Sequence, residues 1–311
     1  MDQEEANREL WEKVSAVQDR RVAGSVSIDE LLDDAVELVA IARRPEYDSC
    51  QSRLCAYDQL IAVYEILDPV GYAPEVEKTT RELRQETGPE TACFFCLAVS
   101  QTRAARLQGH LDRARRIYEE TTALLPRNYV GLYYRMRLAA QRIHLALAEK
   151  NGPAARAAFE ILTGTGAFMQ KQWGHVESIR SRLLDNEELI REMEVLVLLA
   201  EGHPQEAHEI YLEGCHRDAP NPGRLAVQHD LVAALEREND VDLAAILDDM
   251  ATFAAQRTYP RDLARVALVQ LRVARARGSD ESQPIATLHK ALPRLRASDL
   301  HEEAKALGVE V

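Results

Sequence analysis

Apolar side chains recur at α-helical spacing along nearly the whole chain, and this periodicity is the strongest constraint on its fold. Residues 27–42, SIDELLDDAVELVAIA, carry apolar residues at 28, 31, 32, 35, 36, 39 and 40, on one helical face. Ser27 and Glu30 form the S-x-x-E pattern of a capping box at the start of this run. Similar runs alternate with short breaks that carry glycine or asparagine, the residues that commonly end helices. The pattern predicts about sixteen helices, no strand and an all-α fold.

Two segments have a composition that is not typical of a helix. The segment CFFCLAV at 93–99 has the composition of a buried strand, but it continues at helical spacing into SQTRAARL, so we expect a helix. The segment GTGAF at 164–168 is rich in glycine and no strand precedes it. We expect a turn or a kink there.

Composition restricts the compartment and the class of partner. The N-terminal stretch MDQEEANRELWEKV is charged throughout, unlike a signal peptide, and no apolar stretch is long enough for a membrane span. The five cysteines then indicate reduced thiols, so we expect a cytoplasmic protein. The 32 arginines against 6 lysines suggest a bacterium with a GC-rich genome. A net charge of −13 disfavours nucleic acid, which needs a continuous basic face.

A glycine, an alanine and an aromatic residue recur at fixed spacing. Gly109, Ala114 and Tyr118 are repeated as Gly202, Ala207 and Tyr211, and a third copy has Asn239, Ala244 and Asp248. The glycine permits a tight turn between antiparallel helices, the alanine lets the second helix approach the first, and the aromatic ring fills the gap behind. We therefore expect five of these residues to be buried between helices: Ala114, Tyr118, Ala207, Tyr211 and Ala244.

This signature resembles the tetratricopeptide repeat (TPR), a helix–turn–helix unit of about 34 residues whose copies stack side by side. The match is best at 95–128 and weaker at 188–221 and 225–258. Residues 1–90 contain helical pairs without the signature, and residues 91–311 contain the repeat array. The resemblance implies a right-handed superhelix, or solenoid, of stacked antiparallel helix pairs with degenerate repeats. Another helical arrangement is the alternative.

The candidate binding site is a basic region within an acidic chain. Residues 103–142 carry nine arginines against three acidic residues. In tetratricopeptide arrays the first helix of each pair lines a concave groove, and the register of the resemblance places five chemically suitable side chains there: Arg103, Arg106, Tyr133, Tyr134 and Arg137. Guanidinium groups bind carboxylates in a bidentate manner, and tyrosines add flat apolar area. The alternative is that these arginines pair with Glu119, Glu120 and other acids on solvated faces.

The cysteine, glutamate and histidine motifs of the sequence do not form a recognisable metal or redox site. Cys93 and Cys96 form a CxxC and Cys50 and Cys55 are not far away, but both pairs fall inside expected helices, where small buried thiols are common. Glu213 and His216 form one Glu-x-x-His pair without the second copy that a di-iron bundle needs. Phosphate-binding loops and HExxH motifs are absent. We expect no metal, no cofactor and no catalysis.

The sequence therefore predicts a non-catalytic scaffold, an adaptor, chaperone or regulator that holds a protein or peptide segment of acidic character in a concave groove. One alternative is a peptide-sensing bacterial regulator of the quorum-sensing receptor type without its own DNA-binding domain, because residues 1–90 lack a basic recognition helix. The other alternative is a metal-dependent enzyme on a helical scaffold. The partner, the pathway and the oligomeric state stay open.

Overall fold

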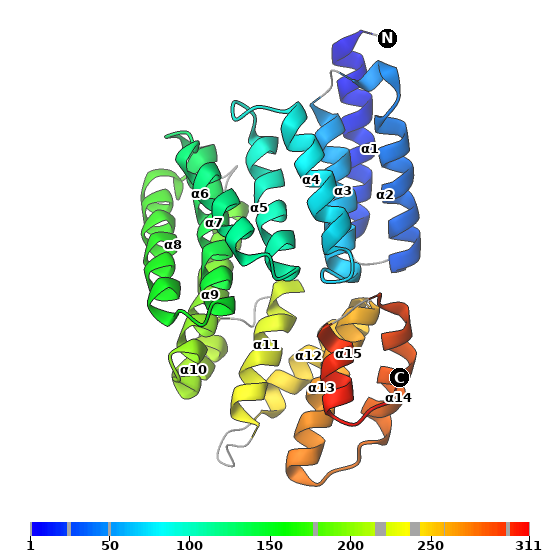
Figure 1. The fold of residues 1–311 in the computed structure, drawn as a ribbon, viewed down its shortest axis with the longest axis vertical. Coiled ribbons are helices and arrows are strands. Elements are labelled where there is room, and N and C mark those ends of the chain that lie inside the picture. The colour runs from blue at the N-terminus through cyan, green and yellow to red at the C-terminus, as the bar shows by residue number, and fades with distance from the viewer. Residues whose placement is uncertain are drawn as a thin grey trace.

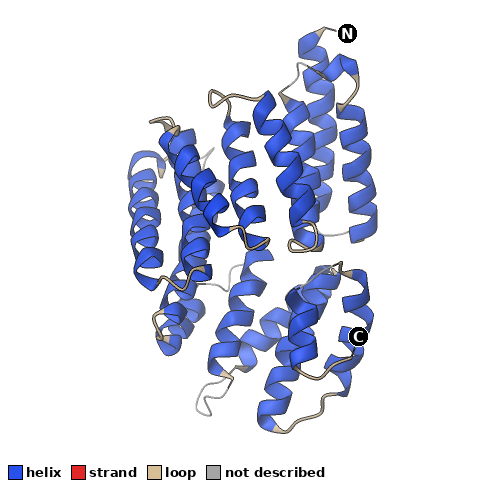
Figure 2. Cartoon of the chain, viewed as in Figure 1, coloured by secondary structure: helices blue, strands red, loops and turns tan. Residues whose placement is uncertain are grey.

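The protein is all-helical. The computed structural model describes residues 2–23, 26–48, 51–176, 180–214, 222–236, 243–257, 259–296 and 299–310. All regular structure in these ranges is helical and none of it is strand, which confirms the expected all-α class (Figure 2). Within the same ranges, no helix combines the length and the apolar character that a membrane crossing needs.

Fifteen α-helices and two short 3₁₀ helices make up the described ranges. The first eight α-helices are α1 Gln3–Ala23, α2 Ile28–Ala42, α3 Ser52–Leu67, α4 Ala73–Glu86, α5 Ala92–Leu107, α6 Leu111–Ala123, α7 Tyr129–Ala148 and α8 Gly152–Trp173. The remaining seven are α9 Arg180–Ala200, α10 Pro204–Gly214, α11 Pro222–Leu235, α12 Ala244–Arg257, α13 Pro260–Arg277, α14 Ser282–Ala291 and α15 Asp299–Ala306. The 3₁₀ helices are η1 Pro45–Tyr47 and η3 Leu292–Arg294.

Consecutive helices from α1 to α14 pack against each other, and the odd-numbered helices also pack against one another. Thus α3 contacts both α1 and α5, α7 contacts α5 and α9, and α11 contacts α9 and α13. Figure 1 shows the chain passing from the blue helices through green and yellow to red as neighbouring helices. Helices α4 and α5, on either side of residue 90, pack directly on each other, and the proposed division at that residue stays a prediction.

A constant spacing relates side chains on successive odd-numbered helices. Between α3 and α5, Asp58 meets Cys96 and Glu65 meets Arg103, and both pairs are 38 residues apart. The same separation of 38 residues recurs between α1 and α3, between α10 and α12 and between α13 and α15, in the pairs Arg21–Gln59, Tyr211–Asp249 and Arg261–Asp299. Helices two apart in the chain are therefore related by a spacing of 38 residues at several places along the molecule.

Most of the residues predicted to cap helices, to form turns or to be buried between helices do so in the structure. Ser27 and Glu30 form the capping box of α2, each side chain accepting a hydrogen bond from the backbone of the other residue. Gly109 and Gly202 have φ of 77° and 82°, in the left-handed region, and a Cβ at either would meet no atom, so backbone conformation alone favours glycine there. Ala114, Ala207 and Tyr211 are buried, as predicted.

Three local predictions need correction. Ala244 is exposed, because α12 begins at this residue and turns Leu243, Ile246 and Met250 inward instead. Tyr118 is only partly buried and packs at the edge of a small cluster around Phe95. Residues 164–168 are not a turn: they continue α8, because the flanking helical residues outweigh the low helix propensity of two glycines.

The two ends of the chain meet. The C-terminal helices lie below the N-terminal ones in Figure 1, and α13 contacts α3. Tyr259, at the start of α13, is buried in the core cluster of the N-terminal helices. Asp68, directly after α3, is fully buried and accepts hydrogen bonds from the guanidinium of Arg261 at 3.3 Å and the backbone N–H of Arg296 at 3.0 Å. Contacts between residues far apart in sequence therefore join the N-terminal and C-terminal helices.

Candidate functional site

The predicted site residues lie on two helices in direct contact. Arg103 and Arg106 are on α5, and the other three are on α7, which packs against α5. The rings of Tyr133 and Tyr134 meet edge to face at 5.2 Å, and the guanidinium of Arg137 lies 5.1 Å from the centre of the Tyr133 ring. The structure thus gathers these three α7 residues into one cluster of two aromatic rings and a cation.

Arg103 already has a carboxylate partner. Its Nη1 donates to Glu65 of α3 at 2.9 Å, and both side chains are partly exposed. Burial raises the pKa of Glu65, while Arg103 acts to lower it. Sequence reasoning named Glu119 and Glu120 on α6 as the alternative partners, and it missed Glu65. The signal that could have identified Glu65 is the spacing of 38 residues between successive odd-numbered helices.

Arg106, one turn further along α5, differs from Arg103. Its side chain is partly buried, its Nε is buried without a hydrogen-bond acceptor, and its guanidinium forms no ion pair within the described residues. Burial lowers the pKa of Arg106 to about 10, and the positive charge of Arg103 contributes further. Because a pKa near 10 still leaves the group charged at neutral pH, this site holds a cation for which the described part of the chain supplies no ion-paired anion.

His144 of α7 belongs to the same site, although the sequence analysis did not select it. Burial lowers its pKa to about 3, with further lowering by Arg106 first and then Arg103. The imidazole is therefore neutral at physiological pH and offers one donor and one acceptor beside the two arginines. His144 follows Arg106 by the same 38 residues that separate other facing pairs, which is the signal that could have revealed it.

Acidic groups flank the basic site on two sides. On α3, Asp58 accepts a hydrogen bond from the thiol of Cys96 at 3.1 Å, and burial raises the pKa of Asp58. On α9, burial raises the pKa of Glu192 to about 8, Glu188 raises it further, and Arg137 opposes this shift. The arginines thus lie between carboxyl groups whose pKa values are raised by burial.

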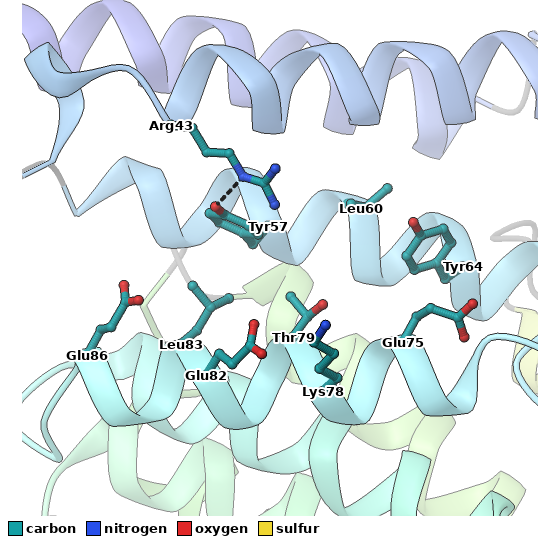
Figure 3. Close-up of a pocket in the computed structure, with 10 residues that line it drawn as sticks. All are labelled: Arg43, Tyr57, Leu60, Tyr64, Glu75, Lys78, Thr79, Glu82, Leu83 and Glu86. Atoms are coloured by element: carbon teal, nitrogen blue, oxygen red, sulfur yellow. Dashed lines mark hydrogen bonds between the residues drawn. The ribbon is translucent and has the colours of Figure 1, made fainter.

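A separate pocket of about 300 Å³ lies between α3 and α4 (Figure 3). Tyr57 and Tyr64 line it from α3, and Arg43 donates through Nε to the Tyr57 hydroxyl at 3.0 Å. The facing side of α4 supplies three glutamates and a lysine, Glu75, Glu82, Glu86 and Lys78. Together with Arg43, the lining carries three acidic and two basic side chains, so opposite charges largely offset each other there. None of the five predicted site residues lines this pocket.

The described ranges contain no cluster of three or more histidine, cysteine, aspartate or glutamate side chains arranged to hold a metal ion. Glu213 is exposed on α10, and His216, Cys50 and Cys215 lie outside the described residues. The fold and the site together define an all-α protein of packed helix pairs with a basic site between α5 and α7. No protein-family model, curated protein or solved structure matches the chain.

Proposed function

We propose that this protein is a non-catalytic binding scaffold of the tetratricopeptide-like type, a right-handed superhelix of stacked helix pairs, and that it holds an acidic segment of a partner protein. Two features support the repeat architecture: the contacts between helices two apart in the chain, and the spacing of 38 residues between facing side chains. That spacing is slightly longer than the roughly 34 residues of the consensus repeat.

The observation that carries the proposal is the guanidinium of Arg106, which forms no ion pair with any residue that the structure describes. A partly buried cation without a counter-ion is unfavourable, and a carboxylate that approaches it would relieve this cost. The planar guanidinium presents paired N–H donors that match the two oxygens of a carboxylate. A hydrogen bond to a charged group contributes about 1.5–3 kcal/mol, so one such contact is enough to dominate the affinity for a short segment.

The neighbouring groups restrict the ligand further. Tyr133 and Tyr134 offer aromatic surface beside the cations, which suits apolar residues next to the acidic ones. Because Glu65 already pairs with Arg103, the site has less free positive charge than its arginines suggest and does not suit a ligand that is acidic along its whole length. A short acidic stretch with apolar neighbours therefore fits best.

Fluorescence anisotropy tests the proposal directly. The probe is a labelled peptide in which a short run of glutamates is flanked by leucines, and the same peptide with lysines in place of the glutamates is the control probe. We expect binding of the acidic peptide only, with affinity that falls as salt is added, because salt screens the charges. Arg106→Ala should weaken binding by about tenfold or more, as expected from the loss of one charged hydrogen bond.

Arg116→Ala is the matched control, because Arg116 is exposed on α6, outside the proposed site, and its removal changes the net charge equally. Circular dichroism verifies that both variants stay helical. Equal affinities of Arg106→Ala and Arg116→Ala, or binding of both peptides alike, would show that the arginines are ordinary surface charges.

A further inference from the structure

Two cysteine thiols face each other across the contact between α3 and α5. The hydrogen bonds Cys96–Asp58 and Arg103–Glu65 fix the register of these helices, since each pair is 38 residues apart. Cys93 and Cys55 have the same separation and lie three residues earlier on their helices than Cys96 and Asp58. The register therefore places the two thiols opposite each other, and each shifts the pKa of the other, as expected for two neighbouring sulfurs. Both residues are partly exposed to solvent.

Cys93 has the surroundings of a reactive thiol. It lies in the first turn of α5, where the helix dipole and free N–H groups favour a negative charge. The neighbouring Cys55 thiol and the side chain of Gln51 lower the pKa of Cys93 to about 7 despite burial. A substantial fraction of Cys93 is therefore thiolate at neutral pH.

Cys55 is held protonated by the same contact. The proximity of Cys93 is the largest cause that raises the Cys55 pKa, followed by burial. Once the Cys93 sulfur has reacted and lost its negative charge, that contribution disappears and Cys55 can release its proton more easily. The pair thus has the two properties that sequential reaction requires, one thiolate ready to react and one thiol that becomes reactive afterwards.

Cys96, one turn further along α5, supplies a contrast within the same helix. Its thiol donates to the carboxylate of Asp58 at 3.1 Å, and burial together with Asp58 raises its pKa well above the usual value. A thiol that faces a carboxylate remains protonated and is a poor nucleophile. The reactivity is therefore expected at Cys93 and not at the second cysteine of the CxxC.

We propose that Cys93 is an oxidation site for hydroperoxides and that Cys55 resolves the product into a disulfide that joins α3 to α5. The Cys93 thiolate attacks one peroxide oxygen, an S–O bond forms, the O–O bond breaks, and the other oxygen leaves as hydroxide, or as alkoxide from an organic peroxide. The Cys55 sulfur then attacks the resulting sulfenic acid, an S–S bond forms, the S–O bond breaks, and water leaves with the Cys55 proton. The two thiols lose two electrons and the peroxide gains them.

The site is adjacent to the surface that the proposed function uses but does not depend on it. The pKa of Tyr134 is raised mainly by burial and also by Cys96 and Cys93, so its ring lies within electrostatic reach of these thiols. A disulfide between α3 and α5 would fix the contact between these helices beside that ring. Thiol chemistry alone tests the inference, without any peptide ligand.

The experiment uses the full chain with Cys50→Ser and Cys215→Ser, which removes the two cysteines outside the described residues. Iodoacetamide alkylation is followed by peptide mass spectrometry across a pH series. We expect Cys93 to react with a midpoint near pH 7 and at least about tenfold faster than Cys96 at that pH, because only thiolates are alkylated. Equal rates at the two positions would overturn the assignment of Cys93.

Hydrogen peroxide then tests the disulfide. Peptide mapping without reductant should yield the Cys55 and Cys93 peptides joined, with a mass two hydrogens below their sum. Cys55→Ser should lose the cross-link and leave a Cys93 sulfenic acid that dimedone traps, whereas the matched variant Cys96→Ser should keep the cross-link. Should Cys55→Ser fail to fold, the map of the parent chain decides alone, and a parent chain without the Cys55–Cys93 cross-link overturns the proposal.

Discussion

Replacement of Asp68 by alanine should separate the two ends of the array. The carboxylate is fully buried and accepts three hydrogen bonds, from the backbone N–H of Gly71 at 3.1 Å, the backbone N–H of Arg296 at 3.0 Å, and the guanidinium of Arg261 at 3.3 Å. The Gly71 bond is local, but the other two come from the C-terminal region. One side chain therefore joins the end of α3 to the start of α13 and to the segment that follows η3.

The size of the effect follows from these contacts. An N–H that loses its acceptor away from water costs about 1–3 kcal/mol, and Asp68→Ala removes the acceptor of two partly buried backbone N–H groups. Arg261 keeps its bonds to Asp299, at 2.9 and 3.1 Å, so the loss of its longer bond to Asp68 costs less. Since breaking a buried ion pair typically costs about 3–5 kcal/mol, we expect a decrease of about that size in the free energy of unfolding.

Urea unfolding followed by circular dichroism measures this decrease, and hydrogen exchange by mass spectrometry locates it. Exchange should increase in α13 and α15 while α8, on the far side of the array, stays protected. Asp68→Asn should destabilise almost as much as alanine, because both carboxylate oxygens accept hydrogen bonds and an amide replaces one of them by a donor.

The matched control is Asp29→Ala. Asp29 also joins the two ends, through Arg294 at 2.7 Å, but its side chain is 74% exposed. Exposed ion pairs contribute about 0–1 kcal/mol, so this variant should lose little stability. If Asp68→Ala cost no more than Asp29→Ala, or if its exchange rose equally throughout the chain, the buried carboxylate would not be what closes the array.

Three further predictions concern single positions. Burial and two arginines lower the pKa of His144 to about 3 in the folded protein, whereas a histidine in the unfolded chain has a pKa near 6.5. Stability should therefore fall as the pH decreases from about 6.5 toward 3, because only the unfolded chain takes up the proton in that range. His144→Phe should flatten that fall in urea titrations. Gly131→Ala should destabilise the protein by about 1–3 kcal/mol, since a Cβ would lie 1.7 Å from the carbonyl oxygen of Pro126. Gly164→Ala should instead stabilise α8 by about 0.5–1 kcal/mol in the same assay, because a Cβ there would meet open space and alanine has the higher helix propensity. Ser27→Ala should cost about 1 kcal/mol in thermal unfolding through loss of the capping box, and a change within error would contradict the cap.

Local sequence signals predicted much of the helical framework. The capping box at Ser27, the left-handed glycines at 109 and 202 and the buried Ala114 and Ala207 depend on residues within a few turns of each other, so their spacing can be read from one segment. The same reasoning was wrong at Ala244, since the start of α12 decides which residues of its first turn face inward. It was also wrong at 164–168, where a long helix continues through two glycines.

The composition of the candidate site needed the tertiary structure. The sequence selected Arg103 and Arg106 by charge, but only the stacking of α3, α5 and α7 shows that Glu65 pairs with the first and that the second has no counter-ion among the described residues. The pairing of Cys55 with Cys93 and the contact of Asp68 with Arg261 also depend on how helices stack. Periodicity within a segment determines which face of a helix is apolar, whereas the offset between two helices depends on how their side chains interlock, and no single segment contains that information.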